Sequence, residues 1–137
     1  MARILVIDDD EMVADSLAAQ LRCFGHEPTT SRDGRKGLEA CEQTRFDLVL
    51  VDIFMPEMEG LEFVRIFRGR HPALPVIVMT GGMANDVRRD HTIGLYLGMV
   101  DRLGADATLK KPFDPGQLLQ CVNTCLAGNH TARSAGI

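Results

Sequence analysis

Four short apolar segments, each followed by a polar side chain, constrain the fold of this 137-residue chain more than any other feature. They cover residues 4–7, 47–51, 75–79 and 107–109. Short segments rich in β-branched residues are typical of strands that are buried on both faces of a parallel sheet. Ligands of such sheets bind just outside the carboxyl ends of the strands. The polar residues that follow these segments should therefore meet at one edge of the sheet.

The polar side chains after the four segments are three carboxylates, one hydroxyl and one ammonium group. Asp8 and Asp9 follow the first segment, Asp52 the second, Thr80 the third and Lys111 the fourth. In a sheet of order 2-1-3-4-5 the strands that carry the aspartates are neighbours, so the three carboxylates converge. Carboxylates this close repel one another unless a divalent cation is present. The sequence therefore predicts a metal-dependent phosphate site.

Each residue type fits a step of phosphate chemistry. Hard oxygen ligands in a partly hydrated site suit Mg²⁺, which commonly bridges to a phosphate, and Mn²⁺ is an alternative ion. Asp52 lies centrally and is the candidate nucleophile for an aspartyl phosphate. Thr80 would donate a hydrogen bond to a phosphoryl oxygen, and Lys111 would neutralise its charge.

Every one of these signals also has a purely structural alternative. An acidic pair directly after a strand often caps the next helix. Asp52 and Thr80 could form turns, and Lys110 with Lys111 could be a solvated surface pair. These alternatives stay open for each residue alone, but their ordered occurrence at four strand ends favours the phosphate site.

Amphipathic helical segments alternate with the apolar segments along the whole chain. The first half predicts a helix over 11–24 that ends at Gly25, a weak strand over 27–31, and a helix with Leu38, Cys41 and Phe46 inward. The second half predicts a helix carrying Leu61, Val64 and Phe67, a loop over 81–92, a helix carrying Leu95, Met99 and Leu103, and a last helix with Leu118, Leu119, Val122 and Leu126 inward that stops at Gly128. This alternation predicts an α/β, flavodoxin-like (βα)5 doubly wound sandwich, with a five-stranded parallel sheet in the order 2-1-3-4-5 and helices on both faces.

Length and composition are those of one ordinary globular domain, with 45% hydrophobic and 25% charged residues. We expect this domain over residues 1–127 and a short disordered tail over 128–137. The formal net charge of −4 argues against nucleic-acid binding. No segment is long enough to span a membrane, and the first strand leaves no room for a signal peptide. We therefore expect a cytoplasmic protein without nucleic-acid or membrane partners.

Of the four cysteines, Cys121 and Cys125 lie four residues apart on a predicted helix and so share one face. No further Cys or His stands near them at the spacing of a metal site. We interpret the cysteines as reduced packing residues, with a redox role left open.

Four motifs occur in a fixed order: ILVIDDD at 4–10, DIFMPEMEG at 52–60, MTGG at 79–82, and GAD at 104–106 with KPF at 111–113. Together they resemble the receiver domain of bacterial response regulators, the CheY-like family. The resemblance covers residues 2–127, and the combination of motifs is highly specific.

The resemblance implies a stand-alone signalling switch rather than an enzyme that acts on a separate substrate. A histidine kinase or a histidine phosphotransfer protein would donate a phosphoryl group to Asp52, with Mg²⁺ required. Thr80 would be the switch hydroxyl and Lys111 the phosphate-pairing lysine. Output would pass to a protein target through the face of the fourth helix and fifth strand, without a DNA-binding output domain. The implied metal ligands are Asp8, Asp9, Asp52 and the backbone carbonyl of Phe54.

Two departures from the family pattern concern the switch itself. Thr108 stands where the family often has Tyr or Phe, and a hydroxyl of that size cannot make the same aromatic gate. Tyr96 and Phe113 are the alternative candidates for that role, or else residues of the core or rim. The stretch between Thr80 and Lys111 is also longer than is usual in the family. Its residues 81–92 would form a lid or partner-recognition loop, or else a tolerated surface insertion. The loop residues singled out for the first role are Gly81, Gly82, Arg88 and Arg89.

Two other functions compete with this interpretation. A haloacid-dehalogenase-type phosphohydrolase also uses a strand-terminal Asp with Mg²⁺, but that family has a second Asp where this chain has Phe54. A receiver-like interaction module that is never phosphorylated is favoured only by Thr108 and the long loop.

Overall fold

The computed structural model describes residues 1–52, 60–80 and 105–134. Within these residues five parallel strands form one sheet in the order β2-β1-β3-β4-β5, as the alternating pattern predicts. The strands are β1 (Arg3–Ile7), β2 (Glu27–Ser31), β3 (Leu48–Asp52), β4 (Val76–Thr80) and β5 (Ala107–Lys110). The helices are α1 (Glu11–Cys23), α2 (Gly34–Gln43), α3 (Gly60–Arg70) and α5 (Pro115–Ser134). The loop and helix predicted over 81–103 lie outside the described residues.

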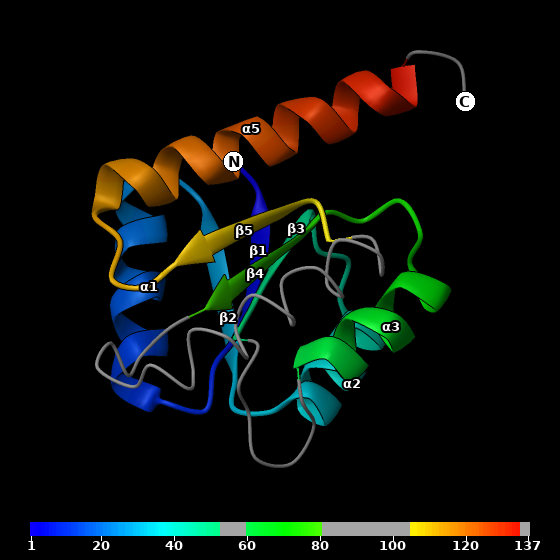
Figure 1. The fold of residues 1–137 in the computed structure, drawn as a ribbon, viewed down its shortest axis with the longest axis horizontal. Helices are drawn as coiled ribbons and strands as arrows, with labels where there is room; N and C mark the ends of the chain where they lie inside the picture. Colours follow the sequence, from blue (N-terminus) through cyan, green and yellow to red (C-terminus); the bar gives the residue numbers. More distant parts are fainter. Residues whose placement is uncertain (53–59, 81–104, 135–137) are drawn as a thin grey trace, which may run out of the picture.

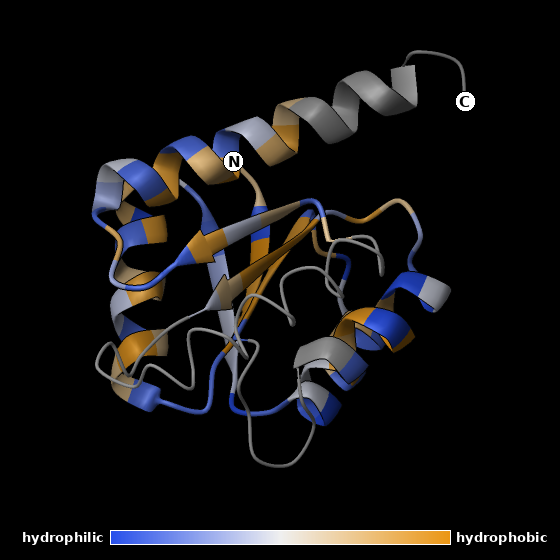
Figure 2. Cartoon of the chain, viewed as in Figure 1, coloured by the Kyte–Doolittle hydropathy of each residue, from blue (hydrophilic) through white to orange (hydrophobic). Residues whose placement is uncertain are grey.

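The helices cover the sheet from both sides, and each side has its own hydrophobic core. Figure 1 shows α1 and α5 on one face and α2 and α3 on the other. Because successive side chains of a strand point to opposite faces, Ile4 and Val6 pack on the α1 and α5 side, while Leu5 and Ile7 pack on the α2 and α3 side. Figure 2 shows the hydrophobic residues gathered on the central strands, with both kinds of residue on the helices.

Both ends of α1 follow from local residue chemistry. At its start the side chain of Asp10 accepts hydrogen bonds from the backbone N–H groups of Met12 and Val13, at 3.0 and 3.4 Å. At its end Gly25 has a φ of +86°, a left-handed conformation that glycine adopts without strain. Asp10 and Gly25 therefore mark where α1 begins and ends. The start of α1 in turn positions Asp8 and Asp9, which precede it.

The structure corrects three details of the prediction. Phe46 is buried but lies beyond α2, because the chain becomes extended at Thr44. Leu119 is half-buried and outside the hydrophobic core that holds Leu118 and Val122.

The third correction concerns the end of α5, which continues through Gly128 to Ser134. The predicted stop of this helix at Gly128 is wrong, because α5 runs past it. A glycine inside a helix costs only about 1 kcal/mol relative to alanine, so by itself it does not end one.

None of the described helices combines the length and the apolar character needed to cross a membrane.

Close packing of α2 on the sheet gives a first prediction. A Cβ atom on Gly37 would overlap Cδ1 of Ile7 and lie 3.0 Å from its Cγ1, whereas a Cβ on Gly69 in α3 would meet nothing within 4 Å. Gly37→Ala should lower the free energy of unfolding by about 1–3 kcal/mol through overpacking. The matched change Gly69→Ala should raise it by about 0.5–1 kcal/mol through helix propensity. Urea unfolding measures both, and equal effects would contradict this packing.

A second prediction concerns His26, whose Nδ1 accepts a hydrogen bond of 3.1 Å from the backbone N–H of Ala2. Burial, helped by the positive N-terminal amino group, lowers the pKa of His26 from its usual 6.5. The unfolded chain therefore binds a proton more readily than the folded one, and protonation also removes the acceptor. Neutral His26 therefore contributes to the free energy of unfolding. Its contribution is complete above about pH 6.5 and is lost as the pH falls through the lowered pKa of His26 in the folded protein.

The measurement is the free energy of unfolding as a function of pH, from about 7.5 down to 5, for the wild type and for His26→Asn. The wild type should lose stability more steeply than the variant over this window. Parallel curves would contradict the role of His26.

Candidate functional site

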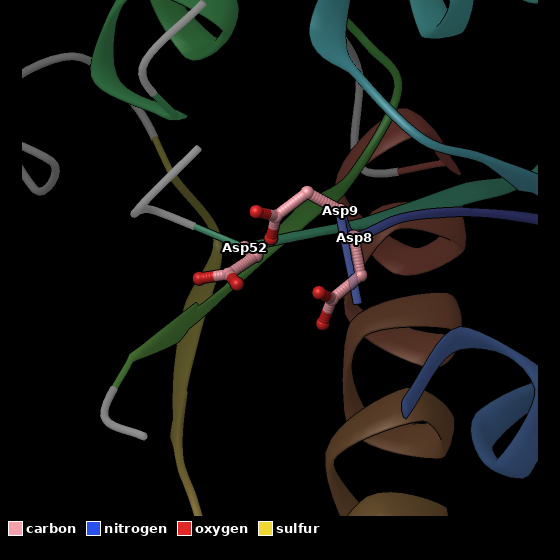
Figure 3. A group of neighbouring side chains, drawn as sticks. All are labelled: Asp8, Asp9 and Asp52. Carbon is pink, nitrogen blue, oxygen red and sulfur yellow. The ribbon is translucent and has the colours of Figure 1, made fainter. Parts of the chain in front are cut away.

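Three carboxylates meet at the carboxyl edge of the sheet, as the strand order predicts. Asp8 and Asp9 follow β1 and Asp52 ends β3, and one oxygen of each lies within 4.8 Å of the others. Figure 3 shows the three side chains side by side at the ends of these neighbouring strands. Asp8 is fully buried and Asp52 is 7% exposed, whereas Asp9 faces solvent. The cluster is thus a partly hydrated group of negative charges.

Lys111 supplies the positive charge at this edge. Its Nζ lies 2.8 Å from Oδ2 of Asp8 and 3.5 Å from Oδ2 of Asp52. Its side chain is only 16% exposed, so the two contacts are poorly screened by water. Lys110, by contrast, is exposed on β5. Lys111 therefore lies at this edge with the carboxylates. Of the two lysines, only Lys110 is a solvated surface residue.

Opposing effects act on the pKa of Lys111. Burial alone would lower it, because an ammonium group loses its hydration. The hydrogen bond to Asp8 and the negative charges of Asp52 and Asp8 outweigh that effect and raise the pKa of Lys111 above its usual value. The stabilisation by these contacts is therefore fully present below a pH of about 10.5 and is lost only above it.

Consecutive aspartates after β1 have different partners. Asp10 is the residue that caps α1, so capping does not account for the acidic pair before it. Asp8 accepts the backbone N–H of Asp10 on Oδ1, at 2.9 Å, and the ammonium of Lys111 on Oδ2. Both Asp8 oxygens are thus engaged within the protein.

The two threonines differ in position. Thr80 is the last residue of β4 and is 2% exposed, one residue beyond Met79, which pairs with Asp52. Its backbone carbonyl accepts the N–H of Lys111 at 2.7 Å, which joins the ends of β4 and β5. Thr108 lies on β5 and is exposed.

Some predicted site residues lie outside the described residues: Phe54, Gly81, Gly82, Arg88 and Arg89.

A second polar cluster, which no sequence prediction covered, lies at the opposite edge of the sheet. Oδ2 of Asp106 accepts the backbone N–H of Val76 and one N–H of Arg68, both at 2.8 Å. Arg68 also donates to the carbonyl oxygens of Pro72 and Leu74, each at 2.9 Å. This cluster fixes where β4 and β5 begin. The GAD motif at 104–106 is the only sequence signal that pointed to Asp106.

The acidic cluster suits a magnesium ion in both donor type and spacing. Mg²⁺ binds oxygen at 2.0–2.1 Å in an octahedron, so two of its ligand oxygens are roughly 2.9–4.2 Å apart. Three carboxylate oxygens within 4.8 Å of one another need only a small contraction to meet that geometry. Asp8, Asp9 and Asp52 would hold the ion, and its two positive charges would offset most of their negative charge.

Comparison with known proteins decides the family. The family model for the response regulator receiver domain matches residues 4–123, which is most of the chain. The chain belongs to the response regulator receiver domain family. Receiver domains are phosphoacceptor signalling switches that interact with histidine kinases or phosphotransfer proteins and bind Mg²⁺ through an acidic pocket. This family membership excludes the haloacid-dehalogenase alternative.

Similar proteins agree with that family. The DNA-binding response regulator MtrA of Mycolicibacterium paratuberculosis is 34% identical over 127 residues, covering 93% of this chain and 52% of that protein. Among solved structures, a CheY-like receiver domain protein from Methanospirillum hungatei has a TM-score of 0.82 at 29% identity, covering 96% of this chain and 98% of that one. The chemotaxis protein CheY4 of Vibrio cholerae has a TM-score of 0.79 at 28% identity, covering 91% and 98%.

This receiver chain spans about half the length of the curated relatives that it matches. DNA binding is therefore a property of MtrA as named, and the receiver domain is the part that the two proteins share.

A third prediction tests the metal site by ligand linkage. Mg²⁺ at ten times its dissociation constant should raise the free energy of unfolding by about 1.4 kcal/mol, since it binds only the folded cluster. Asp9→Asn removes an exposed ligand without disturbing the core and should abolish most of this gain. Asp10→Asn is the matched control, because asparagine also caps helices and Asp10 lies outside the cluster. Calorimetry with and without Mg²⁺ measures the gain, and an equal gain in all three proteins would contradict the site.

Proposed function

We propose that this receiver domain is a phosphorylation-dependent switch in which Asp52 accepts the phosphoryl group. The donor is a histidine kinase or a histidine phosphotransfer protein, and Asp8, Asp9 and Asp52 hold the Mg²⁺ ion. The observation that carries the proposal is the half-buried ammonium group of Lys111, which lies between Asp8 and Asp52 at the edge where the three carboxylates meet.

The contacts of the three aspartates favour Asp52 as the nucleophile. Both oxygens of Asp8 already accept hydrogen bonds from the protein, and Asp8 is fully buried. Asp9 is exposed and suits a hydrated metal ligand. Asp52 combines a slightly exposed carboxylate, a central position in the sheet and a longer, weaker contact with Lys111. An attacking oxygen on Asp52 would therefore lie next to both charges that stabilise the transferred group.

Phosphorylation would change the partner of Lys111. An aspartyl phosphate carries nearly two negative charges and three strong acceptor oxygens, by analogy with other phosphorylated side chains. Lys111 would then pair with the phosphate, and the hydroxyl of Thr80 would donate to another phosphoryl oxygen. Because the Lys111 N–H is bonded to the Thr80 carbonyl, movement at either residue passes to the ends of both β4 and β5.

This connection supports a switch that needs no aromatic side chain at Thr108. Thr108 and Lys110 are exposed on β5, two residues apart and so on the same face of the strand. A shift of the Thr80–Lys111 connection would alter that face directly. We infer that the downstream target is a protein that binds over β5. We also infer that the receiver unit presenting this face covers residues 1–127.

The fourth prediction is the direct test of phosphorylation. Incubation with acetyl phosphate and Mg²⁺ should add the mass of one phosphoryl group to the wild-type protein, and EDTA should prevent it. Asp52→Ala should remove the gain completely, because no other carboxylate has the same placement. Asp15→Asn, an exposed change on α1, is the matched control and should leave the gain intact. Equal labelling of the wild type and Asp52→Ala would contradict the assignment of Asp52.

A further inference from the structure

Asp10, the third of the consecutive aspartates after β1, lies between the acidic cluster and α1 and contacts both. Its backbone N–H donates to Oδ1 of Asp8 at 2.9 Å. Its side chain accepts the backbone N–H groups of Met12 and Val13, at 3.0 and 3.4 Å, and its carbonyl accepts the N–H of Ala14 at 3.0 Å. The backbone donor, the backbone acceptor and the side chain of Asp10 are thus all engaged.

The backbone conformation of Asp10 links these contacts. Its φ of −86° and ψ of 105° are extended, so Asp10 is the residue at which the chain turns from the end of β1 into α1. The carbonyl of such a residue accepts the first bond of the helix, whereas its N–H lies outside the helical hydrogen bonds. The bonds to Met12 and Val13 hold Asp10 in this conformation and thereby fix the direction in which its N–H meets Asp8.

The orientation of the Asp8 carboxylate depends on this N–H. The backbone of Asp8 is held by β2, because its N–H donates to the carbonyl of Ser31 at 3.1 Å. Its carboxylate has two contacts in the described part of the chain, the Asp10 N–H and the ammonium group of Lys111 at 2.8 Å. An ionised carboxylate has about four lone-pair positions, so Asp8 can keep both contacts and still bind a metal ion.

The two contacts of the Asp8 carboxylate differ in permanence. In the proposed function, on which this inference rests, Lys111 turns to the phosphate on Asp52, and the Asp10 N–H is then the contact that still orients Asp8. Groups that hydrogen-bond a metal ligand and orient it commonly control metal affinity, and losing one costs about 10–100-fold. We propose that Asp10 is a positioning residue of the metal site. By capping α1 it aims its backbone N–H at Asp8 and so holds that carboxylate in place for Mg²⁺.

Asp33 offers a matched comparison at the start of α2. It also follows a strand of the sheet, has an extended backbone with φ −148° and ψ 166°, and accepts the N–H of Lys36 at 2.8 Å. Asp33 does not belong to the acidic cluster, and none of its hydrogen bonds within the described ranges reaches a member of it. Loss of either cap weakens the start of a helix, but only loss of the Asp10 cap releases Asp8.

The experiment is a calorimetric titration of Mg²⁺ into the unphosphorylated protein, so it does not depend on phosphoryl transfer. The wild type is compared with Asp10→Ala, Asp10→Asn, Asp10→Ser and Asp33→Ala. Alanine removes the cap, whereas asparagine and serine restore it without the charge. We expect Asp10→Ala to weaken Mg²⁺ binding about tenfold, and the other two Asp10 variants to bind like the wild type. Asp33→Ala should unfold at a lower urea concentration, as Asp10→Ala does, but keep the wild-type affinity.

The contrary results differ in what they overturn. Equal weakening in all three Asp10 variants would assign the effect to the charge of Asp10, and unchanged affinity in Asp10→Ala would leave Asp10 as a helix cap only. Equal weakening in Asp33→Ala would make the effect one of general stability. Each of these overturns the positioning role alone. A wild type that binds no Mg²⁺ would instead refute the metal site of the proposed function, and the role of Asp10 with it.

Amide hydrogen exchange of the wild type is the second measurement, for the case that Asp10→Ala does not fold. Coupling between two sites is reciprocal, so bound Mg²⁺ should strengthen the cap that positions its ligand. It should therefore slow the exchange of the Met12 and Val13 amides more than that of Lys36, the capped amide of α2. Equal slowing at both caps would overturn the proposal.

Discussion

The ion pair between Lys111 and Asp8 is the interaction on which the site depends. Asp8 has no exposure to solvent, so without the ammonium group at 2.8 Å its charge would be buried unpaired. Breaking a buried pair by removing one partner typically costs about 3–5 kcal/mol. The pair forms only if β1 and β5 place their carboxyl ends at one edge, with β3 and β4 between them. The charge arrangement and the sheet order therefore require each other.

This pair also holds the receiver domain ready for a change in charge. Lys111 lies closer to Asp8 than to Asp52, so its stronger contact is with Asp8 and not with Asp52, the phosphoacceptor that we propose. Charge added at Asp52 competes for the same ammonium group. At the other edge of the sheet, Arg68 and Asp106 fix the start of β4 and β5. In the switch that we propose, movement would therefore be confined to the carboxyl ends of these strands, where Thr80 and Lys111 are joined.

Much of the fold was predictable because strand burial and strand ends leave a strong sequence signal. The apolar segments predicted four of the five strands, and the alternation of strands with helices predicted the sheet order. The convergence of Asp8, Asp9 and Asp52 followed from that order. The end of α5 was not predictable from Gly128. Whether a helix continues through a glycine depends on a small difference between two free energies, the cost of glycine in a helix and the gain from further backbone hydrogen bonds.

Contacts between distant residues were also beyond the sequence. No local pattern shows that Arg68 donates to Asp106 or that Lys111 pairs with Asp8, because these partners are brought together only by the packed sheet. The four-residue spacing of Cys121 and Cys125 predicted that they share one face of a helix.

The most direct test of the switch is the backbone amide NMR spectrum with Mg²⁺, before and after phosphorylation by acetyl phosphate. If Lys111 exchanges Asp8 for a phosphate on Asp52, the amides of Thr80, Lys110 and Lys111 should shift strongly, together with those at the end of β3. Shifts confined to β3 and the residues after β1, with the ends of β4 and β5 unchanged, would contradict the account.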